Sequence, residues 1–261
     1  MKRIFTLLLL LTLGTTSSSL AAPTADEIVN KANLASYYGG DDGKSQVEMI
    51  ITDGQGRTRQ RLFNILRQDV EDGGPQLFFV YFKKPSDVRK TTFLVHKFID
   101  KDDDRWMYLP SLDLVKRIAA ADKRTSFMGS HFLYEDVSGR NITADTHKLV
   151  EETAEHYILD NVPVNPEGVR FASYRIWIDK KNYMPTRTDY LDKAGKVYRR
   201  VEVLESKVID AIPTVTLSKA SNLEDGGHTV ATFSKIKYNL GLKDSIFSER
   251  YLRRPPREAR K

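Results

Sequence analysis

Residues 106–137, WMYLPSLDLVKRIAAADKRTSFMGSHFLYEDV, decide which fold the rest of the chain can adopt. The segment 106–109 is aromatic or apolar at every position, and we expect it to form a strand. Residues 110–113 supply turn chemistry, because proline fixes φ and aspartate can bond to its own backbone. The chain then returns as a second strand over 114–118, in which charged residues mix with aliphatic ones.

The next segment, 119–130, is small, polar and basic except for the adjacent pair Phe127 and Met128. We expect this segment to be mobile and residues 131–137 to be extended again. A strand that is covered on one face alternates apolar with polar residues. Strand 106–109 does not alternate, and neither does LFFVYF at 77–82. The sequence therefore requires something to cover the second face of these strands.

One helix is expected, over residues 24–38, where Thr24 and Glu27 form a capping-box pattern and two glycines follow the last turn. After it, the chain reads as short strands separated by turns such as 53–56 (DGQG). The further expected strands are 45–52, 57–67, 77–82, 91–99, 148–160, 171–179, 186–191, 196–208, 214–222 and 229–239. This pattern predicts a mainly β protein built on one antiparallel sheet or barrel.

Length and composition favour a folded domain. The chain has 261 residues, of which 40% are hydrophobic and 29% are charged. No stretch has the composition of a linker, so we predict a single domain over residues 22–252.

Residues 1–21 have the pattern of a signal peptide and are set aside from the fold. Lys2 and Arg3 precede an apolar run at 4–13, and small residues follow at 19–21. A membrane-spanning helix needs about 20 apolar residues, which is roughly twice the length of this run. The chain has no cysteine, so it has neither disulfides nor the lipid-anchoring site of a lipoprotein. We therefore predict a protein exported to a bacterial periplasm.

The net charge of +6 is mild and spread along the chain, apart from a basic end. Residues 253–261 are predicted to form a solvated, disordered tail. Such a tail could touch anionic lipid head groups, whereas the export signal argues against a nucleic-acid partner.

A search for enzyme motifs finds none that is complete. Asp100, Asp102 and Asp104 resemble the start of a calcium loop, but Arg105 and Ser111 stand where that loop needs glycine and glutamate. The five histidines have no metal-ligand spacing, so we predict neither a metal site nor a cofactor.

Glu135 and Asp136 are a carboxylate pair that could carry acid–base chemistry if both were buried. Neighbouring residues on a strand point to opposite faces. We therefore expect one of them to face water, or both to bind backbone or arginine partners. The prediction is a protein that is not an enzyme.

What remains is a surplus of large apolar side chains on the expected strands. They could form an ordinary core, but together they exceed what one short helix can cover. A half-closed barrel with an apolar interior would use them, and such a cavity would take acyl chains, because each buried CH₂ contributes about 0.8 kcal/mol. The candidate lipid-binding residues are Phe78, Val80, Phe82, Leu94, Trp106, Tyr108, Leu114, Phe127, Met128, Phe132 and Tyr134.

Several segments of the chain resemble a known family. The signal peptide and the segments WMYLP at 106–110, VKRI at 115–118, SFMGSHFLYEDV at 126–137 and FSERYL at 247–252 are similar to LolA-like outer-membrane lipoprotein-sorting proteins of the LolA/LolB superfamily. The resemblance is strongest to the branch associated with RND-type exporters. It implies a strongly curved antiparallel half-barrel whose concave face is covered by helices. It also implies a non-enzymatic shuttle for a lipid or lipidated protein.

These observations lead to three hypotheses. In the first, the protein is a monomeric periplasmic carrier that moves its cargo between the inner and outer membranes, with an inner-membrane transporter, such as an RND-type exporter, and transient membrane contact. The helix at 24–38 and the segment 119–130 form its lid, with Phe127 and Met128 facing inward. In the second, the sheet is a binding or regulatory module for an exporter and carries no lipid. In the third, Glu135 or Asp136 serves an enzyme that acts on lipids or glycans.

Overall fold

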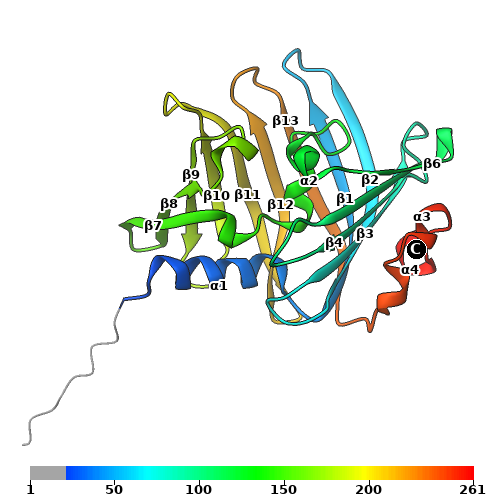
Figure 1. The fold of residues 1–261 in the computed structure, drawn as a ribbon, viewed down its shortest axis with the longest axis horizontal. Helices are drawn as coiled ribbons and strands as arrows, with labels where there is room; N and C mark the ends of the chain where they lie inside the picture. The colour runs from blue at the N-terminus through cyan, green and yellow to red at the C-terminus, as the bar shows by residue number, and fades with distance from the viewer. Residues whose placement is uncertain (1–21) are drawn as a thin grey trace, which may run out of the picture.

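The computed structural model describes residues 22–261, so the signal peptide predicted for residues 1–21 lies outside the described part. Thirteen strands form one antiparallel, strongly curved sheet, which confirms the predicted mainly β architecture (Figure 1). The strands are β1 (Asp42–Thr52), β2 (Thr58–Asp69), β3 (Gln76–Lys84), β4 (Thr92–Lys97), β5 (Asp104–Leu109), β6 (Leu114–Arg117), β7 (Asp145–Glu152), β8 (His156–Pro163), β9 (Ser173–Asp179), β10 (Pro185–Leu191), β11 (Val197–Ile209), β12 (Ile212–Asn222) and β13 (His228–Tyr238).

The order of the strands places the first and the last strand side by side in the middle of the sheet. The first strand, β1, pairs with the last, β13, while β2 to β6 extend to one side and β12 to β7 extend to the other. The strands β6 and β7 are consecutive in the chain but form opposite edges of the sheet. Residues 118–144, which connect them, therefore cross the whole sheet (Figure 1).

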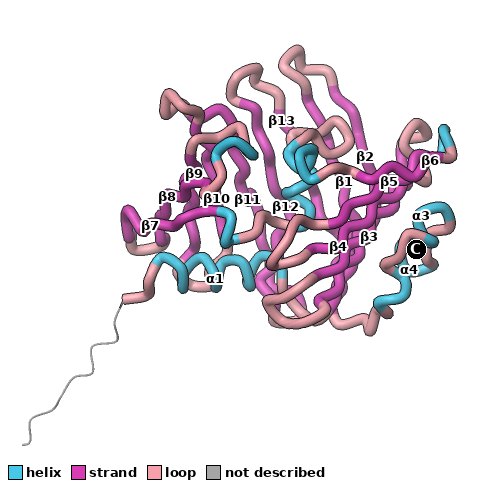
Figure 2. Tube along the Cα trace, viewed as in Figure 1, coloured by secondary structure: helices cyan, strands magenta, loops and turns pink. Residues whose placement is uncertain are grey.

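The helix α1 (Ala25–Tyr37) forms where the sequence predicts it. Thr24 caps its first turn, and the reciprocal bond from Glu27 completes the capping box. Its buried residues Ile28 and Ala32 pack against Leu159 of β8 and neighbouring side chains of β8 and β9. This packing places α1 across the β7–β9 end of the sheet, on the concave side (Figure 2).

The crossing segment fills one half of the concave side with aromatic side chains. Phe127 is 2% exposed, and its ring centroid lies 5.8 Å from that of Phe82 and 5.6 Å from that of Phe93. Phe63 and Tyr134 complete this aromatic cluster, at 6.0 and 5.5 Å from Phe127. The concave faces of β2 to β4 are therefore covered by the chain itself.

Residues 134–137 differ from the expected extended conformation, because they belong to the short helix α2 (Tyr134–Ser138). The side chain of Asp136 accepts a hydrogen bond from the backbone N–H of Leu133 at 2.6 Å, which caps the first turn. A bond between residues three apart favours a helical turn over a strand.

The C-terminal residues also differ from the sequence prediction. The segment 253–261, which its charge predicts to be disordered, contains the helix α4 (Arg257–Arg260), preceded by α3 (Arg250–Arg253). These helices pack on the convex face of β2 to β5, away from the crossing segment (Figure 1). Ala259 is fully buried there, and its carbonyl accepts a hydrogen bond from Asn64 Nδ2 at 2.8 Å.

The cause of this order is the apolar convex surface of the sheet. Leu66, Phe79 and Leu94 point to that face and form a buried cluster with Leu252 and Ala259. Charge counting over the last residues misses this, because two apolar residues among the arginines determine where the segment binds. The C-terminal segment therefore covers the second face of the double-sided strands.

We predict that Leu252→Ala lowers the free energy of unfolding by about 2–5 kcal/mol, because it leaves a cavity against the convex face. The exposed Arg254 is the matched control, and Arg254→Ala should change stability by less than about 0.5 kcal/mol. Urea unfolding measures both variants. Equal midpoints for the two would contradict a stabilising role of the C-terminal segment.

Candidate ligand-binding cavity

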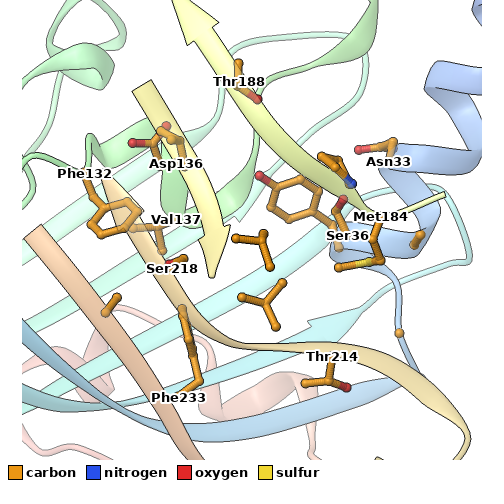
Figure 3. Close-up of a pocket in the computed structure, with 18 of the residues that line it drawn as sticks. Asn33, Ser36, Phe132, Asp136, Val137, Met184, Thr188, Thr214, Ser218 and Phe233 are labelled. Carbon is orange, nitrogen blue, oxygen red and sulfur yellow. The ribbon is translucent and has the colours of Figure 1, made fainter. Parts of the chain in front are cut away.

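A cavity of about 500 Å³ lies between the concave face of the sheet and the helices α1 and α2. Figure 3 shows Asn33 and Ser36 of α1, Asp136 and Val137 of α2, and Phe233 of β13 arranged around it. Small-molecule sites in proteins have volumes of about 300–1,000 Å³. The cavity is therefore large enough to hold a ligand.

The sheet side of the cavity comes from β1 to β3 and β8 to β13, and most of its lining is apolar. Alternate residues of a strand share one face, so Ile176 and Ile178 of β9, and Val201 and Val203 of β11, line the cavity together. The apolar lining residues are Val29, Ala32, Ala35, Val47, Met49, Phe63, Ile65, Phe78, Phe127, Phe132, Val137, Ile142, Ile176, Ile178, Met184, Val201, Val203, Ile212, Val215, Ala231, Phe233 and Ile236.

Charged groups from the crossing segment form one wall of the cavity. Glu135 is 5% exposed and lies between two arginines, pairing with Arg124 and, at 3.2 Å, with Arg140. Arg140 also pairs with Asp145 at 2.7 Å. Burial opposes the charged form of Arg140, but the bonds to Asp145 and the charge of Glu135 outweigh it and raise the pKa of the guanidinium.

The second carboxylate of the pair has its own arginine. Asp136 binds Arg199 of β11 at 2.5 Å, and the guanidinium of Arg199 lies 4.8 Å from the ring centroid of Tyr190. Both Glu135 and Asp136 therefore line the cavity and hold arginine partners, which is one of the two arrangements expected from the sequence. The expectation of opposite faces fails because the two residues belong to a helix.

The predicted lipid-binding residues divide into groups in the structure. Phe78, Phe127 and Phe132 line the cavity. Four others lie on the same side of the sheet but belong to the packed region around Phe127; these are Val80, Phe82, Met128 and Tyr134. Phe127 and Met128 thus point inward, as predicted, with Phe127 forming part of the core.

The structure corrects the placement of three predicted lining residues. Leu94, Trp106 and Tyr108 lie on the convex face, where they pack with the C-terminal segment and not with the cavity. Strand alternation explains this, because their neighbours Phe93, Val95 and Met107 take the concave positions. Leu114, on the edge strand β6, is 46% exposed and also lies outside the lining.

Much of the lining comes from β9 to β13, and none of its residues there belongs to the set predicted from the sequence. Val203, Val215 and Ile236 are only partly buried although they face the cavity, so their apolar surface is available to a ligand. A period-2 pattern in each strand was the available signal. That pattern does not say which face of the sheet is concave.

Within residues 22–261, no group of three or more His, Asp or Glu side chains lies close enough together to hold a metal ion. In the same part of the chain, no helix is long and apolar enough to cross a membrane.

A lysine is buried beneath the end of α1. Lys97 is 3% exposed, and its Nζ lies 5.0 Å from the ring centroid of Tyr37 and 5.7 Å from that of Tyr38. Burial lowers the pKa of Lys97 to about 8, although the nearby carboxylates Asp103 and Asp69 favour the charged form. At neutral pH Lys97 carries its charge in both the folded and the unfolded protein. Burying this charge on folding therefore lowers the stability of the folded protein.

A family model and several solved structures are similar to this chain. A family model whose description reads "uncharacterized protein" matches residues 74–254. A DUF1329 family protein from Desulfovibrio piger is 28% identical, with a TM-score of 0.79, over 87% of this chain and 97% of its own. An outer-membrane lipoprotein-sorting protein domain from Vibrio parahaemolyticus is also 28% identical, with a TM-score of 0.77 over the same shares.

A more distant structure shares the fold. A LolA superfamily protein from Nitrosomonas europaea is 19% identical, with a TM-score of 0.68, over 88% of this chain and 100% of its own. A search among curated proteins returned no match.

We predict that Lys97→Met stabilises the protein near neutral pH, by up to about 3 kcal/mol, because the buried charge is removed. Between pH 8 and the ordinary lysine pKa of 10.5, the unfolded chain keeps a proton on Lys97 that the folded protein has lost. Raising the pH through this window therefore stabilises the wild type, and the advantage of the variant shrinks. Urea unfolding at pH 7.5 and 9.5 measures the difference.

The control for this experiment is Lys193→Met, which removes an exposed lysine from the turn after β10. Tyr38, whose pKa burial raises to about 12, is present in all three proteins and cancels from the comparison. A stability difference between the Lys97→Met variant and the wild type that is the same at both pH values would refute the buried-charge explanation.

Proposed function

Because the chain belongs to the LolA-like family, we propose that it is a non-enzymatic periplasmic carrier that binds the acyl chains of a lipid or lipoprotein in the concave cavity. The observation that carries this proposal is the cavity of about 500 Å³ with its mostly apolar lining. Burial of a hydrocarbon chain against such a lining contributes about 0.8 kcal/mol for each CH₂. A chain of moderate length would therefore bind without any covalent step.

The proposed lid consists of α1 and the crossing segment 118–144. Both line the cavity, and each is tied to the sheet by one apolar cluster, around Ile28 and Phe127 respectively. Movement of either element would expose the lining to a membrane. Release requires that contact with a membrane or a membrane protein favours the open state, because a ligand shifts an equilibrium only through its differential affinity.

The carboxylates support a carrier over an enzyme. Glu135 is held by Arg124 and Arg140, and Asp136 is held by Arg199. A general base needs a carboxylate that is free to accept a proton from a substrate. Glu135 instead joins two parts of the crossing segment, and Asp136 ties that segment to β11 of the sheet.

The proposed route begins with export through the segment 1–21, which has the signal-peptide pattern. The carrier would then take its cargo from an inner-membrane transporter, such as an RND-type exporter, and release it at the outer membrane. The Vibrio parahaemolyticus relative is described as an outer-membrane lipoprotein-sorting protein domain, which supports this direction. We propose that the carrier acts as a monomer and touches each membrane transiently.

We predict that Ser218→Trp reduces loading with a fluorescent fatty acid at least tenfold. Ser218 lines the cavity in β12, and an indole at this position would occupy the space meant for the hydrocarbon chain (Figure 3). Fluorescence titration measures the binding, and native mass spectrometry of protein purified from the periplasm measures any co-purified lipid. Circular dichroism and urea unfolding check that the variant folds.

The control is Lys219→Trp, which adds the same side chain at the next residue, outside the cavity lining. It should load like the wild type. A wild-type protein that stays empty and takes up no fatty acid would remove the carrier proposal. The recovery of an exporter subunit with lipid-free protein would then favour the binding module.

A further inference from the structure

A second cavity, of about 300 Å³, lies on the other side of the charged wall. Nine of its ten lining residues have a polar or positively charged side chain. Three arginines contribute to it, Arg124 from the crossing segment, Arg170 and Arg199, together with His131. Four of the remaining lining residues are serine or asparagine, and no Asp or Glu of the described chain is among the lining residues.

Two ion pairs separate the second cavity from the first. In the pair Glu135–Arg124 and in the pair Asp136–Arg199, the carboxylate lines the apolar cavity while the guanidinium lines the second cavity. The wall between them is therefore polarised. The small cavity receives the positive ends of both pairs.

Arg199 has hydrogen-bond donors that no described residue accepts from. Its side chain is 8% exposed, and it uses Nη2 for Asp136 at 2.5 Å. Its Nε and Nη1 are buried and have no hydrogen-bond partner among the described residues. A buried guanidinium donor without a partner costs free energy, and an anionic oxygen is the acceptor that satisfies it best.

Arg170 stands at the outer side of the same cavity. Its side chain is 65% exposed, it pairs with Glu224 at 2.5 Å, and it lies 4.5 Å from the ring centroid of Tyr198. A guanidinium has five N–H donors, so these contacts leave Arg170 able to bind a further acceptor. Arginine is the residue best suited to hold phosphate or carboxylate through two parallel bonds.

We propose that the second cavity is a binding site for an oxyanion of the phosphate or carboxylate class, held by Arg199 from within and by Arg170 from the outer side. The four arginines of the region, Arg140 included, are balanced by carboxylates, so directed hydrogen bonds rather than net charge provide the affinity. The anion is either the head group of a lipid or a free ion. The lipid version rests on the proposed carrier function.

The test uses the mature chain and three probes that share parts of the ligand. Inorganic phosphate carries only the anion, dodecanol carries only the chain, and dodecyl phosphate carries both. Calorimetric titration at constant ionic strength measures each affinity, because screening by salt would otherwise change with the probe.

The variants are Arg170→Ala and Arg199→Lys. Arg170 is mostly exposed, so its removal leaves the fold intact, whereas lysine at position 199 keeps the charge beside Asp136 but loses the fork of donors. The control is Arg175→Ala, which removes an arginine bound to Asp160, outside the lining of both cavities. We expect both test variants to bind the phosphate-bearing probes about tenfold more weakly than the wild type. The control variant should bind them with unchanged affinity.

The outcomes separate the two proposals. If the test variants lose affinity for dodecyl phosphate alone, the oxyanion site is supported and its ligand is a lipid head group. If they lose affinity for dodecyl phosphate and for inorganic phosphate, the site is supported and also binds a free anion. Arginine-dependent binding of inorganic phosphate without binding of either dodecyl probe keeps the oxyanion site and rejects the acyl carrier. Equal affinities in all variants, or no binding of either phosphate probe, overturn the oxyanion site, while dodecanol binding still decides the carrier.

Discussion

The structure depends on the pairing of β1 with β13. This pairing places the first and the last strand at the centre of one sheet, so that the other strands extend outward and leave β6 and β7 at opposite edges. The connection between these edges must then cross the sheet. Its aromatic residue Phe127 packs among Phe63, Phe82 and Phe93, and the cavity lies between this cluster and the strands β8 to β13. The site is thus a consequence of topology.

The two faces of the sheet are covered by different parts of the chain. The convex side of β2 to β5 is covered by the C-terminal helices, which bury Leu252 and Ala259 against Phe79 and Leu94. Part of the apolar surplus is therefore satisfied within the molecule, without any ligand. What remains for a ligand is the lining of the concave cavity, in which Val203, Val215 and Ile236 are only partly buried.

The short helix α2 joins the charged and the apolar features of the molecule. Its two acidic residues bind arginines of the crossing segment itself and of β11. The pairs Asp136–Arg199 and Arg140–Asp145 tie the crossing segment to the sheet. A buried ion pair contributes little net stability, because desolvation offsets the attraction. Its effect here is to fix position. The pairs Glu135–Arg124 and Asp136–Arg199 place their carboxylates on one cavity and their guanidinium groups on the other, so that an apolar chain and an anionic group would find separate environments within one molecule.

The sequence by itself determined the class of fold, the capped first helix and the resemblance to LolA-like proteins, because these rest on local signals such as period-2 alternation, turn residues and the Thr24–Glu27 capping box. It also identified Phe127 as an inward-facing residue of the crossing segment. Only the tertiary structure decided which face of each strand is concave. Leu94 and Phe93 are neighbours with the same apolar character, yet one packs beneath the C-terminal helices and the other beneath Phe127. Alternation along a strand sorts side chains into two sets, but the curvature of the whole sheet and the path of distant segments determine which set surrounds the cavity.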